Sequence, residues 1–344
     1  MMKKISKNEF SKLFSLIDKT YELYLPIEKE GQVNFSIWEE GAQVNLEALK
    51  TDISPKETIF PQSETYLKYK KNGKKLELKN VGGKKEKYVV FGVRPCDTLG
   101  FQIIDNVFLR EPIDRFYEER RNKGIIISMA CSSPEDTCFC NSFGVKPQDA
   151  PKTADIATWD LGDRLLWSSQ TEKGKELTGK LLDILENATE KDKQQLNTLK
   201  KDIKTKLEDL PLADIKPERI DGELKDLFES KIWEKLSEGC LGCGTCTYVC
   251  PTCHCYDISD FDGGNSGERF RCWDSCMYSD FTLMAHGNIR KTQKERFRQR
   301  FMHKLVYYPN NHGLYACVGC GRCIVKCPVN LDIVKVIKKL GGEK

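Results

Sequence analysis

The sequence predicts three parts: an α/β domain over residues 1–165, an α-helical connector over 166–235, and a cysteine-rich domain over 236–344. Two apolar, β-branched runs around a helical pattern predict the first part. A lysine- and glutamate-rich stretch with spaced leucines predicts the second. A cysteine spacing that occurs twice predicts the third. The length of 344 residues exceeds the usual size of a single core, which agrees with more than one domain.

The α/β domain is predicted from a β-α-β unit. Its strands are the runs Tyr88–Val93 and Gly124–Ala130. A helical crossover between them starts at Asp97, which we take as its N-cap, and continues through the segment 114–121. Such crossovers join parallel strands that are buried on both faces.

Four cysteines follow the two predicted strands. Cys96 and Cys131 come directly after the strand ends, and Cys138 and Cys140 lie just beyond. Because parallel strands end at one edge of a sheet, we expect these thiols to meet there, and four is the number that one [4Fe-4S] cluster requires. A zinc site or a group of ordinary thiols is the alternative. Arg94 and Asp97 flank this site. They either tune its electrostatics or have ordinary structural roles, as the N-cap of a turn and in a surface salt bridge.

The connector is predicted as a solvated helical pair. Residues 172–210 are rich in lysine and glutamate and carry leucines at helical spacing, but no heptad is sustained. Pro211 and Pro217 mark its end.

One cysteine spacing, Cys-x2-Cys-x2-Cys-x3-Cys-Pro, occurs at residues 240–251 and again at 317–328. In two-cluster ferredoxins, three of these cysteines wrap one cubane and the fourth reaches the other cluster. The repeat therefore predicts a ferredoxin-like α+β domain with two [4Fe-4S] clusters, whereas structural zinc would leave the third cysteine and the Cys-Pro without a role. The predicted ligands are Cys240, Cys243, Cys246 and Cys327 for cluster 1, and Cys317, Cys320, Cys323 and Cys250 for cluster 2.

The two motifs are separated by an insertion at about 252–316. It contains four more cysteines, for which packing or free thiols is a better interpretation than another metal site; they are Cys253, Cys255, Cys272 and Cys276, with His254 among them. The basic stretch 290–304 has apolar residues at spacings of three to four, which predicts an amphipathic helix whose basic face docks an acidic redox partner or is solvated.

Composition excludes several classes of function. Sixteen cysteines without an apolar leader segment or any long apolar run predict a cytoplasmic metalloprotein with no membrane span. A net charge of only +4 does not suggest a nucleic-acid surface. No glycine-rich phosphate loop follows a strand, so we expect no flavin or NAD in this chain and no catalytic residues of its own.

Several motifs together resemble the iron-sulfur electron-transfer subunit of anaerobic sulfite reductase and, nearly as closely, the iron-sulfur β subunit of cytoplasmic [NiFe] sulfhydrogenases. The matching stretches run from about residue 85 to the C-terminus and include Phe91–Asp97, Cys138-Phe-Cys140, Cys240–Cys253, Trp273–Cys276 and Cys317–Cys323. The resemblance implies an electron-transfer subunit between a flavoprotein that oxidises NAD(P)H and a catalytic subunit. We expect an NADH-dependent sulfite reductase first and a hydrogenase second. An iron-sulfur scaffold and a redox-sensing regulator are hypotheses from other classes.

Overall fold

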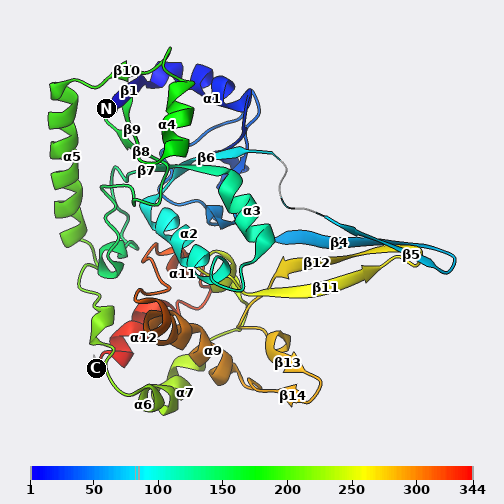
Figure 1. Ribbon diagram of the computed structural model, residues 1–344. Helices are drawn as coiled ribbons and strands as arrows, with labels where there is room; N and C mark the ends of the chain where they lie inside the picture. The colour runs from blue at the N-terminus through cyan, green and yellow to red at the C-terminus, as the bar shows by residue number, and fades with distance from the viewer. Residues whose placement is uncertain (1, 82, 84–85, 343–344) are drawn as a thin grey trace.

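An eight-stranded mixed sheet forms the N-terminal part of the computed structural model, which describes residues 2–81, 83 and 86–342 (Figure 1). The four central strands are parallel, and the strands on either side of them are antiparallel. In sheet order they are β10 (Glu186–Asn187), β1 (Lys3–Ser6), β9 (Arg164–Ser169), β8 (Ile156–Asp160), β7 (Gly124–Met129), β6 (Tyr88–Val93), β2 (Glu22–Lys29) and β3 (Gln32–Ile37).

Both faces of the sheet are covered by helices, as the β-α-β prediction requires. Alternate side chains of β6 enter two different cores, with Val89 on one face and Val90 on the other. Helices α1 (Phe10–Asp18) and α4 (Glu172–Gly179) cover the first face. Helices α2 (Pro95–Phe108) and α3 (Arg115–Lys123) form the crossover and cover the second. The predicted parallel pairing of β6 with β7 is confirmed.

The predicted N-cap of α2, Asp97, is wrong by three residues. The helix begins at Pro95, whose fixed φ suits the first turn, and Arg94 takes the N-cap position. Asp97 instead lies inside the first turn and is buried. Asp114 does cap α3, since its side chain accepts a hydrogen bond from the backbone N–H of Tyr117.

The boundary predicted at residue 165 falls inside β9. Strands β9 and β10 belong to the main sheet, and α5 (Glu190–Glu208) lies along its side, with Leu196 packed against Trp159 and Leu166 (Figure 1). The predicted boundary is wrong because the change to a lysine- and glutamate-rich composition marks the exposed faces of α4 and α5 and not the end of the sheet.

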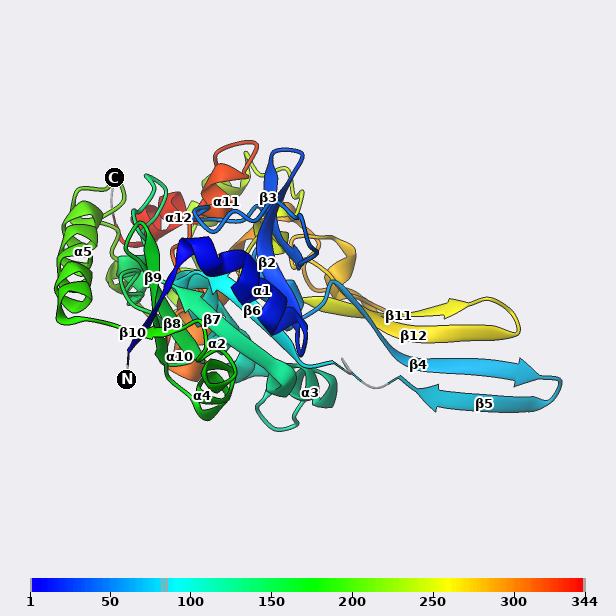
Figure 2. The same cartoon turned by 90° about the horizontal axis from the view of Figure 1, so that it is seen from above.

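A four-stranded antiparallel sheet projects from the body as an arm (Figure 2). It joins two hairpins far apart in sequence, with β12 paired to β4. Its strands are, in order, β11 (Tyr256–Asp262), β12 (Ser266–Trp273), β4 (Ser63–Asn72) and β5 (Lys75–Asn80). The insertion predicted at 252–316 is therefore tied to the N-terminal half and is not an independent piece.

The root of this arm is held by a buried arginine. Arg271 is fully buried and bonds Glu64 and Asp114, at 2.6 Å each. Its guanidinium also lies 5.0 Å from the ring centroid of Phe60. These contacts fix the direction in which the arm leaves the body.

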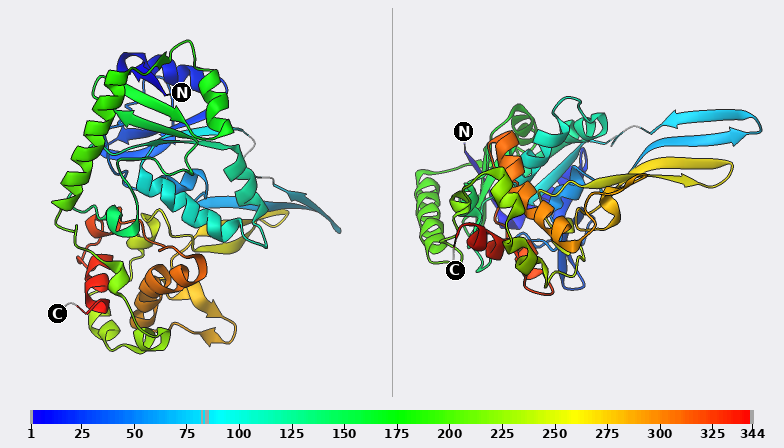
Figure 3. Two further views of the ribbon diagram at one scale, coloured as in Figure 1. Left: turned by 60° about the vertical axis from the view of Figure 1, so that its left-hand side comes forward. Right: turned by 90° about the horizontal axis from the view of Figure 1, so that it is seen from below.

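The C-terminal part is built from short helices around the two cysteine motifs (Figure 3). A π-helical turn, His303–Tyr307, links α9 to α10. None of the helices in the described part of the chain is both long and apolar enough to cross a bilayer. The helices of this part are α6 (Leu224–Glu229), α7 (Ile232–Ser237), α8 (Thr245–Tyr248), α9 (Gln293–Met302), α10 (Tyr308–His312), α11 (Arg322–Val325) and α12 (Ile333–Leu340).

Candidate metal centres

The two cysteine motifs fold in the same way. In each, a glycine with left-handed φ follows the second cysteine, Gly244 at +73° and Gly321 at +77°. The four-residue helices α8 and α11 follow, and they pack against each other. Only glycine adopts this φ without strain, so each turn depends on its glycine. The two equivalent turns, with α8 packed against α11, bring the cysteine loops face to face.

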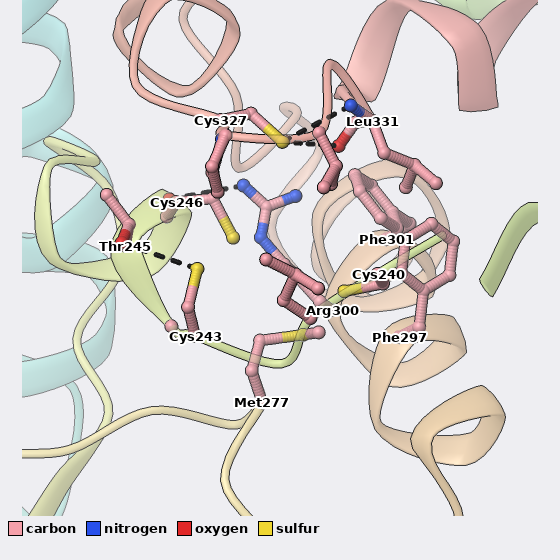
Figure 4. A pocket seen from close by; sticks show the side chains of 14 residues that line it. Cys240, Cys243, Thr245, Cys246, Met277, Phe297, Arg300, Phe301, Cys327 and Leu331 are labelled. Atoms are coloured by element: carbon pink, nitrogen blue, oxygen red, sulfur yellow. Dashed lines mark hydrogen bonds between the residues drawn. The ribbon is translucent and has the colours of Figure 1, made fainter. Parts of the chain in front are cut away.

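The first pocket is lined by Cys240, Cys243 and Cys246 of one motif and by Cys327 of the other (Figure 4). Cys240 Sγ accepts hydrogen bonds from the Gly242 backbone N–H at 3.4 Å and from Gln293 Nε2 at 3.2 Å. Cys327 Sγ accepts one from the backbone N–H of Leu331 at 3.2 Å. Such N–H···S bonds stabilise negative sulfur, and they are a main means by which proteins tune iron-sulfur clusters.

The second pocket has the reciprocal composition. It is lined by Cys317, Cys320 and Cys323 of the C-terminal motif and by Cys250 of the other. Lys304 Nζ donates to Cys250 Sγ at 3.3 Å. The four cysteines predicted for cluster 2 therefore line one pocket, and the four predicted for cluster 1 line another.

The third pocket lies at the carboxyl edge of the main sheet. Cys96 follows β6 and Cys131 follows β7, and both line the pocket together with Cys138 and Cys140 from the next loop. The structure therefore brings all four predicted thiols together. Lys50 lies at the same pocket and bonds Glu135 at 2.6 Å.

The three donor sets suit cubanes better than single ions. Each pocket contains the four cysteines predicted for one cluster, which is the ligand number of a [4Fe-4S] cluster. Met277 also lines the first pocket, and Cys320 of the second set also lines the third. Within the described ranges, no group of three or more His, Cys, Asp or Glu side chains is arranged to hold a single metal ion. Burial raises the pKa of the Cys317 thiol to about 12 and that of Cys131 to about 11, so thiolates in these pockets require compensating positive charge. Iron ions held by these cysteines would supply that charge.

The second and third pockets share a wall. Gly319 and Cys320 line both, and the Phe139 backbone N–H donates to the Gly319 carbonyl at 3.0 Å. A Cβ on Gly319 would lie 2.4 Å from the Phe139 carbonyl oxygen, so only glycine permits this approach. The first and second pockets share the side chain of Arg300.

Buried cations surround the pockets, and the sequence prediction missed them. Burial lowers the pKa of Lys304, but the nearby Cys250 and Cys253 sulfurs outweigh it, so the pKa is raised overall. Arg300 behaves in the same way, with Cys246 and Cys323 as its main partners. Two further basic side chains, Lys56 and Arg322, are likewise buried. A positive charge beside a cluster favours its reduced, more negative state.

Part of the basic stretch 290–304 faces the interior, so the stretch as a whole is not the solvated or docking face that its composition suggested. Phe297 and Phe301 enter the core as predicted, but Arg300 and Lys304 point inward with them. Arg296 donates to the backbone carbonyls of Met277, Arg290 and Lys291. The spacing contained the signal, since Arg300 and Lys304 stand three residues after Phe297 and Phe301 respectively and so share their side of the helix.

The flanking pair Arg94 and Asp97 is also buried, so the surface salt-bridge interpretation is wrong. Arg94 donates to the carbonyls of Leu46, Ala48 and Ala130. Asp97 accepts two hydrogen bonds from Arg322, at 2.6 and 2.8 Å. The ion pair between Asp97 and Arg322 joins the α/β part to the C-terminal part.

The four other cysteines lie around the cluster pockets or on the arm. A hydrogen bond from Cys253 lowers the pKa of Cys250, and one from Cys276 lowers the pKa of Cys255 to about 7. Cys272 lies on β12 opposite Asp257. Burial lowers the pKa of His254 to about 4, and its ring packs against Phe108. These contacts agree with packing roles.

The fold and the cysteine pockets define an iron-sulfur electron-transfer protein, and the family model described as a 4Fe-4S dicluster domain matches residues 239–331. Sulfhydrogenase 2 subunit beta of Pyrococcus furiosus is 33% identical over 343 residues, which is 98% of this chain and 97% of that protein. The chain therefore belongs to the family of sulfhydrogenase β subunits. The similarity also extends over the first 85 residues, where the motifs alone had shown none.

Proposed function

We propose that this chain is an electron relay of three [4Fe-4S] clusters within a hydrogenase-type complex. Cluster 1 is held by Cys240, Cys243, Cys246 and Cys327, cluster 2 by Cys250, Cys317, Cys320 and Cys323, and cluster 3 by Cys96, Cys131, Cys138 and Cys140. When bound, the clusters accept and release single electrons. The protein groups position them, exclude water and set their potentials.

The observation that carries the proposal is the contact between successive pockets. Cluster 3 and cluster 2 would be separated by the wall of Gly319 and Cys320, and clusters 2 and 1 by Arg300. A linear order of 3, 2, 1 follows from these shared walls. A diffusible two-cluster ferredoxin has no use for the third site or for the large sheet that presents it.

The partners we propose are a flavoprotein that exchanges electrons with NAD(P)H and a catalytic subunit with a nickel-iron centre. The similarity to a sulfhydrogenase β subunit favours this interpretation over a sulfite reductase, which the motifs had placed first. The chain itself has the role of a carrier and not of a catalyst.

Iron and sulfide analysis of the anaerobically purified chain tests the proposal. Three clusters require about twelve irons per chain and two require about eight. Cys138→Ala should remove about four irons and one electron paramagnetic resonance signal. Cys272→Ala, which changes a cysteine outside all three pockets, should remove none. About eight irons in the unmodified chain, or no loss in Cys138→Ala, would refute the third cluster.

A further inference from the structure

A short hairpin stands beside the first cysteine loop and exposes apolar side chains. It consists of β13 (Leu283–Met284) and β14 (Gly287–Asn288) and extends from the body below the arm (Figure 1). Leu283 is 59% exposed, Met284 58% and Ile289 66%. A cluster of exposed large apolar residues of this kind marks an interaction site when it is contiguous and rigid.

Hydrogen bonds of Asn288 and of the residues that follow brace the base of the hairpin. The Asn288 side chain accepts from Thr282 at 2.7 Å and from the Arg290 backbone N–H at 2.9 Å. Arg296 Nη1 donates to the carbonyls of Arg290 at 3.1 Å and Lys291 at 3.0 Å. The apolar tip is thus presented in a fixed position.

Both ends of the hairpin rest on the loop that carries Cys240 and Cys243. On one side, Tyr278 Oη donates to the Cys243 carbonyl at 3.3 Å, and its ring lies against Gly244. On the other side, Gln293 donates to Cys240 Sγ and packs over Gly242. The hairpin therefore rises directly beside the first pocket.

The same loop is where the first pocket reaches the surface. Among the sixteen cysteines, all of which lie in the described part of the chain, Cys243 alone is exposed. Its neighbour Leu241 is 67% exposed. Leu241, Leu283, Met284 and Ile289 together form what we call the rim surface, with Arg290 and Lys291 at its margin.

We propose that the rim surface is the docking face for the partner subunit that exchanges electrons with cluster 1. The proposal rests on the proposed function, because cluster 1 ends the relay and must pass electrons to another protein. The fitting partner is a redox subunit with an apolar patch and an acidic margin opposite Arg290 and Lys291. Docking there would cover Cys243, exclude water and bring the partner's redox group next to the only exposed cysteine of the first pocket.

A double substitution at the tip tests this in the native complex. Leu283→Glu with Met284→Glu changes only exposed side chains, so the cluster signals should persist. The steady-state rate of electron transfer through the complex should fall at least about tenfold, because two charges must be desolvated at an apolar interface. The matched control is Leu76→Glu with Leu78→Glu on the arm, where exposure is 54% and 63%. It should leave the rate within about twofold of the unmodified chain.

A photo-reactive phenylalanine analogue at position 289 gives a second test that does not depend on the rate. It should cross-link the chain to a different subunit of the complex, whereas the same group at position 76 should not. A cross-link to a second copy of this chain, no cross-link, or an unchanged rate in the double variant would overturn the docking proposal. Missing cluster signals in the unmodified chain would instead refute the proposed function.

Discussion

The ion pair between Asp97 and Arg322 is expected to be the most sensitive contact between the two parts of the protein. The two side chains are 1% and 2% exposed and are joined by two hydrogen bonds of 2.6 and 2.8 Å. Arg322 also donates to the Thr51 carbonyl at 2.8 Å. Asp97→Asn keeps the volume and removes one charge, which leaves the guanidinium buried without its counterion.

Breaking a buried pair in this way costs about 3–5 kcal/mol. If the whole loss appears in the unfolding rate, about 3 kcal/mol corresponds to roughly a hundredfold faster unfolding. The assay is anaerobic unfolding in urea, followed by tryptophan fluorescence and by the visible absorbance of the clusters. The double variant Asp97→Leu with Arg322→Met should recover most of the loss, because it removes both charges.

A second ion pair between the same regions is the control. Lys326 and Asp52 are 40% and 28% exposed, so Lys326→Met should cost no more than about 1 kcal/mol. Equal effects of Asp97→Asn and Lys326→Met would refute the reasoning, since it depends on the difference in burial. So would a double variant that is as unstable as Asp97→Asn.

Three further predictions concern Gly319, Lys304 and His303. Gly319→Ala should weaken clusters 2 and 3 together, because its Cβ would lie 2.4 Å from a backbone carbonyl, whereas Gly313→Ala, at φ +72° with nothing within 4 Å, should leave iron content unchanged. Lys304→Met should lower the reduction potential of cluster 2, because it removes a positive charge that favours the reduced state. One charge at about 7 Å in a dielectric constant of about 20 corresponds to about 100 mV. A redox titration measures the shift, with substitution of the exposed Lys335 by Met as the control. Burial lowers the pKa of His303 to about 3, so the folded state binds the proton less readily than the unfolded state does. The free energy of unfolding is therefore highest above pH 6.5 and falls as the pH drops toward 3. Between pH 6.5 and 5 the loss is up to about 2 kcal/mol in urea unfolding, and His303→Phe should remove that pH-dependent part.

The spacing of the cysteines along the sequence made it possible to predict which of them lie together. The crossed grouping follows from a motif in which three ligands share one loop and the fourth is displaced. The third group follows from the rule that parallel strands end at one edge, which places Cys96 next to Cys131. In both cases local geometry dictates the neighbours, so a single sequence suffices.

Long-range pairing was not predictable in the same way. β4 pairs with β12 across about two hundred residues, and neither strand has a sequence pattern that identifies the other as its partner. The buried cations posed a similar problem. A lysine-rich or arginine-rich helix normally faces water, and this expectation outweighed the spacing that places Arg300 and Lys304 on the buried side of the helix.

The buried contacts between the two parts occur where the proposed relay passes from one part to the other. Lys56 donates to the carbonyl of Cys253 at 2.9 Å, Asp97 binds Arg322, and the Phe139 backbone meets Gly319. Each contact joins a residue among the first 140 to one of the two cysteine motifs or to the residues directly after it. A buried ion pair adds little stability over apolar packing, so we infer that the pair of Asp97 and Arg322 serves to fix how the two parts are arranged. A relay needs such an arrangement, because a small opening between the parts would lengthen the path between clusters 3 and 2 while leaving each cluster intact.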